Sequence, residues 1–256
     1  VSGLVCASRI RALRIATVTV SGNQVIDTED VTALVQEYLG GYYAYVVPRN
    51  NALLYARKKI QENIARTFPR FRFVDVSREG MTNLHITVAE ERGSALWCGT
   101  TIDPIDPAAP CYFTNEHGMV IDTAPYYSGN VYIRFYGSTL LAAEDEPLGK
   151  SFVDDATYTQ LTVFADGVKA LGLPIRAVRI GGNENAFLLD VGSGAPAFVR
   201  FKAADDYTVL VGNLRAALEK QELKTQLAKD LPYLQYFDLR FTNKVYYKFD
   251  GAEAVN

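Results

Sequence analysis

The sequence predicts an α+β fold in two parts, and three observations lead to this prediction. Hydrophobic residues make up 48% and charged residues 21% of the 256 residues, which is ordinary for a globular protein with a buried core. The chain has 16 Tyr and 13 Phe beside a single Trp, a balance that favours half-buried positions on strands. Two helix-like segments occur early, whereas short strands and turns dominate after Trp97. This change of pattern places a boundary near residue 92.

The first expected strand covers residues 13–20, because its sequence LRIATVTV is short and rich in β-branched residues. It runs into a turn signal, Ser21-Gly22-Asn23. A helix should follow, capped by Asp27 or Thr28 and ended by Gly40. Its apolar residues recur with helical spacing: Val31, Leu34, Val35, Tyr38 and Leu39.

A second helix is expected to open near Asn50 or Asn51 and to end at Phe68-Pro69. The residues that would be buried are Leu53, Ala56, Ile60 and Ile64, with Arg57, Lys58, Lys59 and Glu62 on the other face. The basic run 57–59 is interpreted mainly as a solvated helix face, with an upstream partner site as the alternative.

Two strands complete the first part, at residues 71–76 and 84–90, with a turn around Glu79-Gly80. In the second strand Leu84, Ile86 and Val88 alternate with polar or small residues, as in a strand with one buried face. The order strand, helix, helix, strand, strand closes a small α/β sandwich of roughly 80 residues, near the lower limit for a core that is stable alone.

The second part is expected to be richer in strands. A helix over residues 154–171 follows the acidic, Pro-containing stretch 144–149, and another begins at Asp205-Asp206 and bends before Leu231-Pro232. Strands are expected at residues 111–114, 119–121, 131–136, 175–180, 186–191 and 197–201. The clearest alternation lies at the end, where two adjacent strands cover residues 236–241 and 245–249, before a small polar tail expected to be mobile.

Charge and cysteine spacing argue against several classes of function. The formal net charge of -3 leaves no basic surplus for phosphates, so nucleic-acid binding is not expected. Cys6, Cys98 and Cys111 have no CxxC or His/Cys spacing, which argues against a structural zinc site. Cys98 and Cys111 flank a loop that could bring them together, so a disulfide and two buried free thiols remain equal alternatives.

Enzymatic residues are not apparent either. His85 is expected on the polar side of a strand and His117 in a tight turn, and neither has a nucleophile or acid near it in the sequence. The small-residue run 192–194 lacks the G-x-S-x-G pattern and its strand-to-helix context. We therefore expect no catalytic residues, no metal and no cofactor.

A family resemblance appears in the first part. Residues 18–23 (VTVSGN), followed by two helices and two strands, resemble a POTRA module (polypeptide-transport-associated domain), which has a V-x-V-x-G-N pattern before its first helix. Residues 84–92 (LHITVAEER) and then Trp97 are similar to the strand and tryptophan with which proteins of the FtsQ/DivIB family close this module. Gly93 departs from the family, which usually has another residue or a proline shortly after the arginine.

The second part adds two further matches. Residues 112–120 (YFTNEHGMV) resemble a family hairpin, with Asn115 in place of the commoner Asp, and residues 236–241 (YFDLRF) resemble the y-i-D-L-R-y strand. The resemblance covers residues 13–249. It implies a POTRA domain at 13–92, a mixed, mainly antiparallel FtsQ/DivIB-type β domain with two flanking helices at 93–250, and the tail 251–256.

The resemblance also implies a function. Members of this family are non-catalytic bacterial cell division proteins that hold septal membrane proteins of the FtsB and FtsL type during septum assembly. It implies a single membrane helix upstream of Val1 in the cytoplasmic membrane, with the present residues on its outer side. The alternative is a POTRA-containing factor for protein transport or outer-membrane assembly, although such proteins usually carry POTRA repeats and a long barrel.

By the same resemblance, the partner would add a strand to the edge formed by residues 244–249. The residues expected to bind it are Arg240, Phe241, Tyr246, Tyr247 and Phe249. Two of these have structural alternatives: Arg240 can pair with Asp238, and Phe249 can belong to the core. With Tyr247 and Phe249 as exposed anchors, lysine at either position should abolish partner binding and leave the domain folded.

Overall fold

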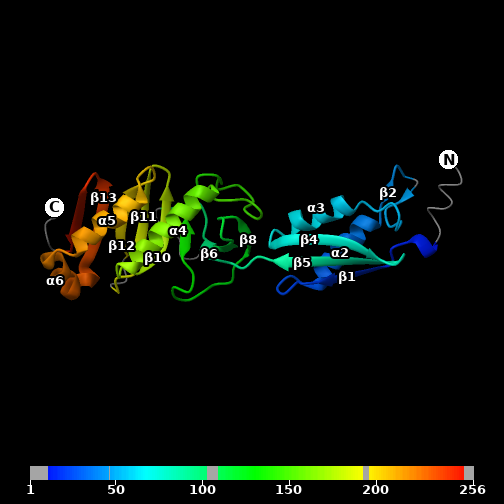
Figure 1. Ribbon diagram of the computed structural model, residues 1–256, viewed down its shortest axis with the longest axis horizontal. Helices are drawn as coiled ribbons and strands as arrows, with labels where there is room; N and C mark the ends of the chain where they lie inside the picture. The colour runs from blue at the N-terminus through cyan, green and yellow to red at the C-terminus, as the bar shows by residue number, and fades with distance from the viewer. Residues whose placement is uncertain (1–10, 46, 103–108, 193–195, 251–256) are drawn as a thin grey trace. The chain divides into compact units, whose positions relative to one another are not determined.

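The computed structural model describes residues 11–45, 47–102, 109–192 and 196–250, and the chain divides into two compact units. Unit 1 comprises residues 1–92 and unit 2 residues 93–256, with the boundary where the sequence pattern changes. Both units combine helices with a sheet, so the fold is α+β (Figure 1). The tail 251–256, expected to be mobile, lies outside the described residues.

Unit 1 has a three-stranded sheet in the order β1-β5-β4. The first strand runs parallel to β5, and β4 is antiparallel to β5. A small hairpin, β2 and β3, lies between the two helices in the sequence. The elements in chain order are η1 (Arg11–Leu13), β1 (Thr17–Ser21), α2 (Thr28–Leu39), β2 (Tyr42–Tyr43), β3 (Val47–Pro48), α3 (Arg57–Thr67), β4 (Phe71–Glu79) and β5 (Asn83–Glu90).

The core of unit 1 confirms the periodicity of its best-defined segments. Val31 and Val35 of α2 and Ile60 and Ile64 of α3 are buried against the sheet. The alternating residues of β5 are buried as expected: Leu84, Ile86 and Val88. The helices therefore cover one face of the sheet with the residues that recur every three or four positions.

Two expected boundaries in unit 1 were wrong. The strand expected at residues 13–20 begins only at Thr17, because residues 11–13 form a 3-10 turn. The helix expected from Asn50 or Asn51 begins at Arg57, and Leu53, expected in the core, is 59% exposed. The Asn51 side chain accepts a hydrogen bond from the Leu53 N–H at 2.9 Å, which closes a separate turn before the helix.

A clasp joins the end of β5 to the segment that follows β1 in unit 1. The Glu90 carboxylate at the end of β5 accepts hydrogen bonds at 2.8–3.0 Å from three successive backbone N–H groups, those of Gln24, Val25 and Ile26. Arg70 lies 3.4 Å from the same carboxylate. Burial opposes ionisation of Glu90, but the backbone donors and Arg70 outweigh it, so the pKa of Glu90 lies below its ordinary value.

This clasp predicts an acid-dependent loss of stability in unit 1. Because the pKa of Glu90 is lowered on folding, its stabilisation is present above the unfolded-state pKa of about 4.3 and is lost as the pH falls through the lower folded value. We expect Glu90→Gln to lower stability at neutral pH and to flatten the stability profile below about pH 4.3. Urea unfolding at several pH values measures this, and an unchanged acid slope would contradict the role.

Unit 2 is built on one nine-stranded mixed sheet in the order β14-β13-β12-β11-β10-β9-β6-β7-β8. Five of its neighbouring pairs are antiparallel and three are parallel, so it is mainly antiparallel. Its strands are β6 (Ala95–Trp97), β7 (Tyr112–Thr114), β8 (Val120–Thr123), β9 (Arg134–Tyr136), β10 (Ile175–Gly181), β11 (Glu184–Leu189), β12 (Ala197–Lys202), β13 (Leu234–Phe241) and β14 (Lys244–Phe249).

The helices of unit 2 are α4 (Asp155–Ala170), α5 (Tyr207–Leu218) and α6 (Gln221–Asp230), followed by η2 (Leu231–Tyr233). Figure 1 shows α4 and α5 lying along the sheet. Phe164 of α4 packs on Phe187 and Phe201 of the sheet, with ring centroids 4.8 and 4.9 Å apart. The core of unit 2 therefore lies between its helices and one face of the sheet.

Three expectations for unit 2 needed correction. The segment expected to be one helix from residue 205 is divided into α5 and α6. The strand expected at residues 131–136 covers only 134–136, and Val131 is exposed. Strand β6 was not expected, because three residues are too few to show alternation. Its Trp97 is buried and donates a hydrogen bond from Nε1 to the Gly137 carbonyl at 2.9 Å.

Candidate functional site

The two ends of the nine-stranded sheet differ in how well they are covered. At one end, the Val120 N–H of β8 donates to the Lys150 carbonyl at 2.9 Å, and the Val120 carbonyl accepts from the Gly149 N–H at 2.8 Å. At the other end, β14 pairs with β13 and with no other strand among the described residues. Alternate backbone groups of an edge strand point away from the sheet. The β14 edge is therefore the one that a further strand could join.

The face that each β14 side chain occupies decides which residues a partner could touch. Tyr247 and Phe249 are 7% and 3% exposed and belong to the core beneath the helices. Their expected role as exposed anchors was wrong, because the alternation of β14 turns both rings toward α5 and its neighbours. Tyr246 and Lys248 occupy the opposite face and are partly exposed.

An exposed aromatic pair lies beside the hairpin between β13 and β14. Phe241 is 50% exposed, and its ring lies edge-on to that of Tyr246 with centroids 4.9 Å apart. The hairpin has a two-residue loop in which Asn243 adopts φ 57°, a left-handed conformation that asparagine tolerates well. Of the five expected partner-binding residues, Phe241 and Tyr246 thus present an accessible apolar surface.

Arg240 is held by two carboxylates of its own chain. Its Nε donates to Asp238 Oδ1 at 2.9 Å, and its Nη1 donates to both carboxylate oxygens of Glu184 at 2.8 Å. Burial opposes ionisation of Asp238, but the Arg240 hydrogen bonds outweigh it and lower the Asp238 pKa, while the same bonds raise the pKa of Arg240. The pairing with Asp238 therefore holds, and Arg240 joins β13 to the start of β11.

A row of cations and rings lies near this site, on β10, β12 and β13. The Arg200 guanidinium lies 5.1 Å from the centroid of the Tyr236 ring and 5.7 Å from that of Phe198, and Arg179 lies 5.5 Å from Phe198. Sequence reasoning missed this row. The alternation of side chains along β12 could have indicated it, because this alternation places Phe198 and Arg200 on the face opposite the buried Val199 and Phe201.

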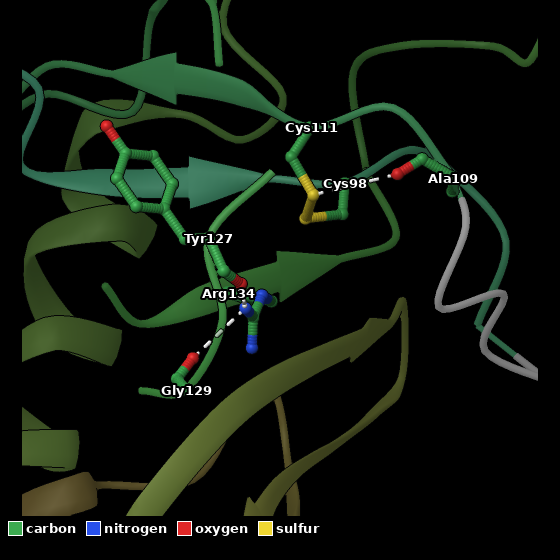
Figure 2. The surroundings of a disulfide bond; sticks show 6 residues. All are labelled: Cys98, Ala109, Cys111, Tyr127, Gly129 and Arg134. Atoms are coloured by element: carbon green, nitrogen blue, oxygen red, sulfur yellow. Dashed lines mark hydrogen bonds between the residues drawn. A yellow bond between two sulfur atoms is a disulfide. The ribbon is translucent and has the colours of Figure 1, made fainter. Parts of the chain in front are cut away.

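Cys98 and Cys111 form a disulfide, which resolves the alternatives left open by the sequence. The bond joins the end of β6 to the start of β7, beside the side chain of Arg134 (Figure 2). Arg134 donates to the carbonyls of Tyr127 at 2.8 Å and Gly129 at 3.1 Å, as Figure 2 shows. These contacts fix the segment 127–129 beside the disulfide.

A cavity of about 970 Å³ opens beside this disulfide. Its lining includes Leu96, Tyr136, Ala177 and Leu188 from neighbouring strands, together with Arg134 and Arg176. Neither histidine of the chain is among the lining residues. A lining that combines apolar side chains with guanidinium groups and the carboxylate of Asp190 can hold a ligand or chain segment.

Both histidines make hydrogen bonds away from this cavity. His85 on β5 lies 3.0 Å from Thr19 Oγ1 through Nδ1 and 3.0 Å from Ser21 Oγ through Nε2, so it bridges two residues of β1. A serine beside a histidine can form a nucleophilic pair, but that chemistry needs the second ring nitrogen to be oriented by an acid. Here the Thr19 hydroxyl is hydrogen bonded to that nitrogen, and the nearest carboxylate oxygen, Glu79 Oε1, lies 4.0 Å from it, beyond hydrogen-bond distance. His117 lies 2.8 Å from Asp155 at the start of α4.

No family model matches the chain, and no curated protein matches it. Within the described ranges, no helix is long and apolar enough to cross a bilayer, and no group of three His, Cys, Asp or Glu side chains is placed to hold a metal ion. The fold and site define a two-unit α+β protein whose larger sheet ends in an open strand.

Proposed function

We propose that this chain is a non-catalytic docking protein that binds another polypeptide by adding its strand to β14. The observation that supports this is the difference between the two sheet ends: the start of β8, at Val120, is hydrogen bonded on its outer side to residues 149 and 150, and β14 is not paired on its outer side by any described residue. An added strand would satisfy the outward backbone groups, and Phe241 and Tyr246 would supply apolar contact beside it.

The sequence resemblance gives this proposal its biological setting. We infer an FtsQ/DivIB-type cell division protein with a POTRA-like unit 1, which holds FtsB/FtsL-like septal membrane proteins during septum assembly. Such a protein would have one membrane helix upstream of Val1 and would expose both units outside the cytoplasmic membrane. A disulfide is in keeping with an oxidising compartment of that kind. Residues 24–26, which bind the Glu90 carboxylate, follow directly after Gly22-Asn23. The motif at residues 18–23 and the motif at residues 84–92 are therefore linked by hydrogen bonds, which is a structural reason for the two to occur together.

The proposal predicts a specific loss of affinity. We expect Phe241→Ala combined with Tyr246→Ala to weaken binding of the extracytoplasmic segments of FtsB/FtsL-like partners by at least about 30-fold, since an interface aromatic commonly contributes about 2 kcal/mol. Titration calorimetry on the purified chain measures this. The control is Val163→Ala, which trims a 67% exposed apolar side chain of α4 in the same unit without touching β14 or the cavity beside the disulfide.

Hydrogen exchange locates the contact independently of mutation. Partner binding should slow exchange of the outward amides in β14 and leave the Val120 amide of β8 unchanged, because that amide already donates to the Lys150 carbonyl. Protection at β8 alone, or equal losses of affinity in the control and the double variant, would contradict strand addition at β14. Capture of barrel substrates in place of septal partners would favour the transport alternative.

A further inference from the structure

Unit 1 gathers most of its exposed apolar side chains at one end. Among the described residues of this unit, seven large hydrophobic side chains are exposed, and two of them, Val25 and Phe73, lie elsewhere. The other five, which we call the apolar tip, are Tyr42 (55% exposed), Tyr45 (97%), Leu53 (59%), Leu54 (51%) and Met81 (45%). Scattered exposed apolar residues are normal, whereas a cluster of them marks an interaction surface.

Backbone contacts bring the segments of the apolar tip together. The Arg49 N–H donates to the Gly41 carbonyl at 2.9 Å, which closes the β2–β3 hairpin that carries Tyr42 and Tyr45. Arg78, near the end of β4, donates to the carbonyl of Ala52 at 2.8 Å, next to Leu53 and Leu54. The β4–β5 turn, which carries Met81, is therefore close to the turn that carries the two leucines.

The apolar tip is also the end where the chain enters unit 1. The Ile15 N–H donates to the Asn50 carbonyl, and the Ala52 N–H donates to the Leu13 carbonyl, both at 2.8 Å. The Ala16 N–H donates to the Thr82 carbonyl of the β4–β5 turn at 2.8 Å. Figure 1 shows β2 at the end of unit 1 where β5 begins, and β5 runs from there toward the opposite end.

The hairpin backbone holds Tyr45 outward at an energetic cost. Ala44 and Tyr45 have φ values of 44° and 62°, a left-handed conformation that is rare for residues other than glycine, asparagine and aspartate. A bulky ring on a strained backbone, 97% exposed, does nothing for the core of unit 1. Strain of this kind is found at sites that contact a ligand or partner.

Basic side chains surround the apolar tip. Arg14, Arg49 and Arg78 come from the segments just described. Arg49 lies over the rings of Tyr38 and Tyr43 at 5.0 and 5.7 Å, and none of the three arginines forms an ion pair with another described residue. Lys58 and Lys59 are exposed in the first turn of α3, which contains no acidic residue and where the helix dipole disfavours positive charge. This placement is unfavourable for the isolated unit and favourable beside an anionic surface.

We propose that the apolar tip binds the surface of a lipid bilayer that contains anionic headgroups. Tyrosine rings suit the interfacial layer because they combine an apolar body with a polar tip, and leucine and methionine can enter the acyl boundary. The surrounding arginines and lysines complement anionic headgroups. Protruding side chains on a strained hairpin suit insertion into a fluid surface, whereas a protein partner would need a matching pocket for each. The inference does not depend on strand addition at β14.

Flotation of the purified chain with vesicles tests this proposal. The chain should bind vesicles of phosphatidylcholine mixed with phosphatidylglycerol, and more weakly to phosphatidylcholine alone or at higher ionic strength. Leu53→Ser combined with Leu54→Ser should weaken binding about tenfold or more, because two exposed leucines lose their insertion. Lys58→Gln combined with Lys59→Gln should weaken binding to the anionic vesicles about tenfold and leave the weak binding to neutral vesicles unchanged.

Two controls make the result specific. Phe73→Ser removes a ring that is 53% exposed and lies near the start of β4, at the opposite end of the strand, so it should bind vesicles like the unchanged chain. The Phe241→Ala and Tyr246→Ala variant should also bind vesicles normally, which separates this proposal from the docking function. Absence of vesicle binding, unchanged binding of the leucine variant, or concentration-dependent self-association without vesicle binding would each overturn the proposal.

Discussion

Phe249→Lys is expected to destabilise unit 2 by about 4 kcal/mol or more, the largest effect that we predict for a single substitution. The Phe249 ring is 3% exposed and belongs to the core that also contains Tyr247 and Phe237. Removing a buried phenyl ring typically costs about 3–5 kcal/mol, and the ammonium group of lysine adds a further cost of burial. Because a whole domain is stable by only about 5–15 kcal/mol, β14 should detach or unit 2 should unfold.

The single Trp97 provides the measurement for Phe249→Lys, since it is buried in unit 2 and reports that unit alone. Its fluorescence transition in urea should move to lower concentration. Tyr246→Lys is the matched control, because its side chain lies on the open face that already carries Lys248. Equal stability of the Phe249 variant and the control would show that Phe249 is not part of the core.

The second large effect is expected at Gly22, where the chain leaves β1. Gly22 has φ +92°, and a Cβ atom there would lie 2.0 Å from the backbone oxygen of Val88 on β5. A left-handed conformation costs an alanine about 1–2 kcal/mol, and the contact with Val88 forces the strands apart at a further cost of about 1–3 kcal/mol. We expect Gly22→Ala to destabilise unit 1 by roughly 3 kcal/mol or more.

Gly80→Ala is the control for Gly22→Ala, because Gly80 has φ +70° and a Cβ atom there would have no neighbouring atom within 4 Å. It should cost only the conformational part, about 1–2 kcal/mol. Both variants should change the circular dichroism transition and leave the Trp97 fluorescence transition in place, since Trp97 belongs to unit 2. A shift of equal size for the two glycines would argue against the close approach to Val88.

Helix boundaries were predictable wherever local chemistry sets them. Helix α2 begins at Thr28 and is followed by Gly40, at the positions that the sequence indicated, but Asp27 at its N-cap makes no side-chain capping hydrogen bond. Helix α4 begins after Asp154, whose side chain accepts a hydrogen bond from the Thr157 N–H at 2.9 Å. The start of α3 could not be predicted, because the turn stabilised by Asn51 competes with a helix that apolar spacing alone would extend.

The sequence predicted that the candidate site lies on the last strand, but not which face of β14 meets the helices. Alternation shows that Val245, Tyr247 and Phe249 share a face, but this pattern alone leaves open whether that face meets the helices or a partner. The answer depends on α5, which packs near β14 although it lies more than 25 residues earlier in the sequence. The contact between Arg240 and Glu184 could not be predicted either, because it joins residues 56 positions apart in the sequence.

The parallel pairing of β1 with β5 affects how unit 1 forms during synthesis. Thr17 pairs with Asn83 and Ser21 with Thr87, so β1 cannot pair until β5, whose residues lie 66 positions later, has been synthesised. The Glu90 carboxylate that binds residues 24–26 arrives later still. Pairings between distant residues slow folding, because the intervening chain must be ordered before they form. A nascent chain that ends before β5 therefore keeps the edge of β1 and the inner faces of both helices uncovered, and unit 1 closes in a late, cooperative step once Glu90 has been added.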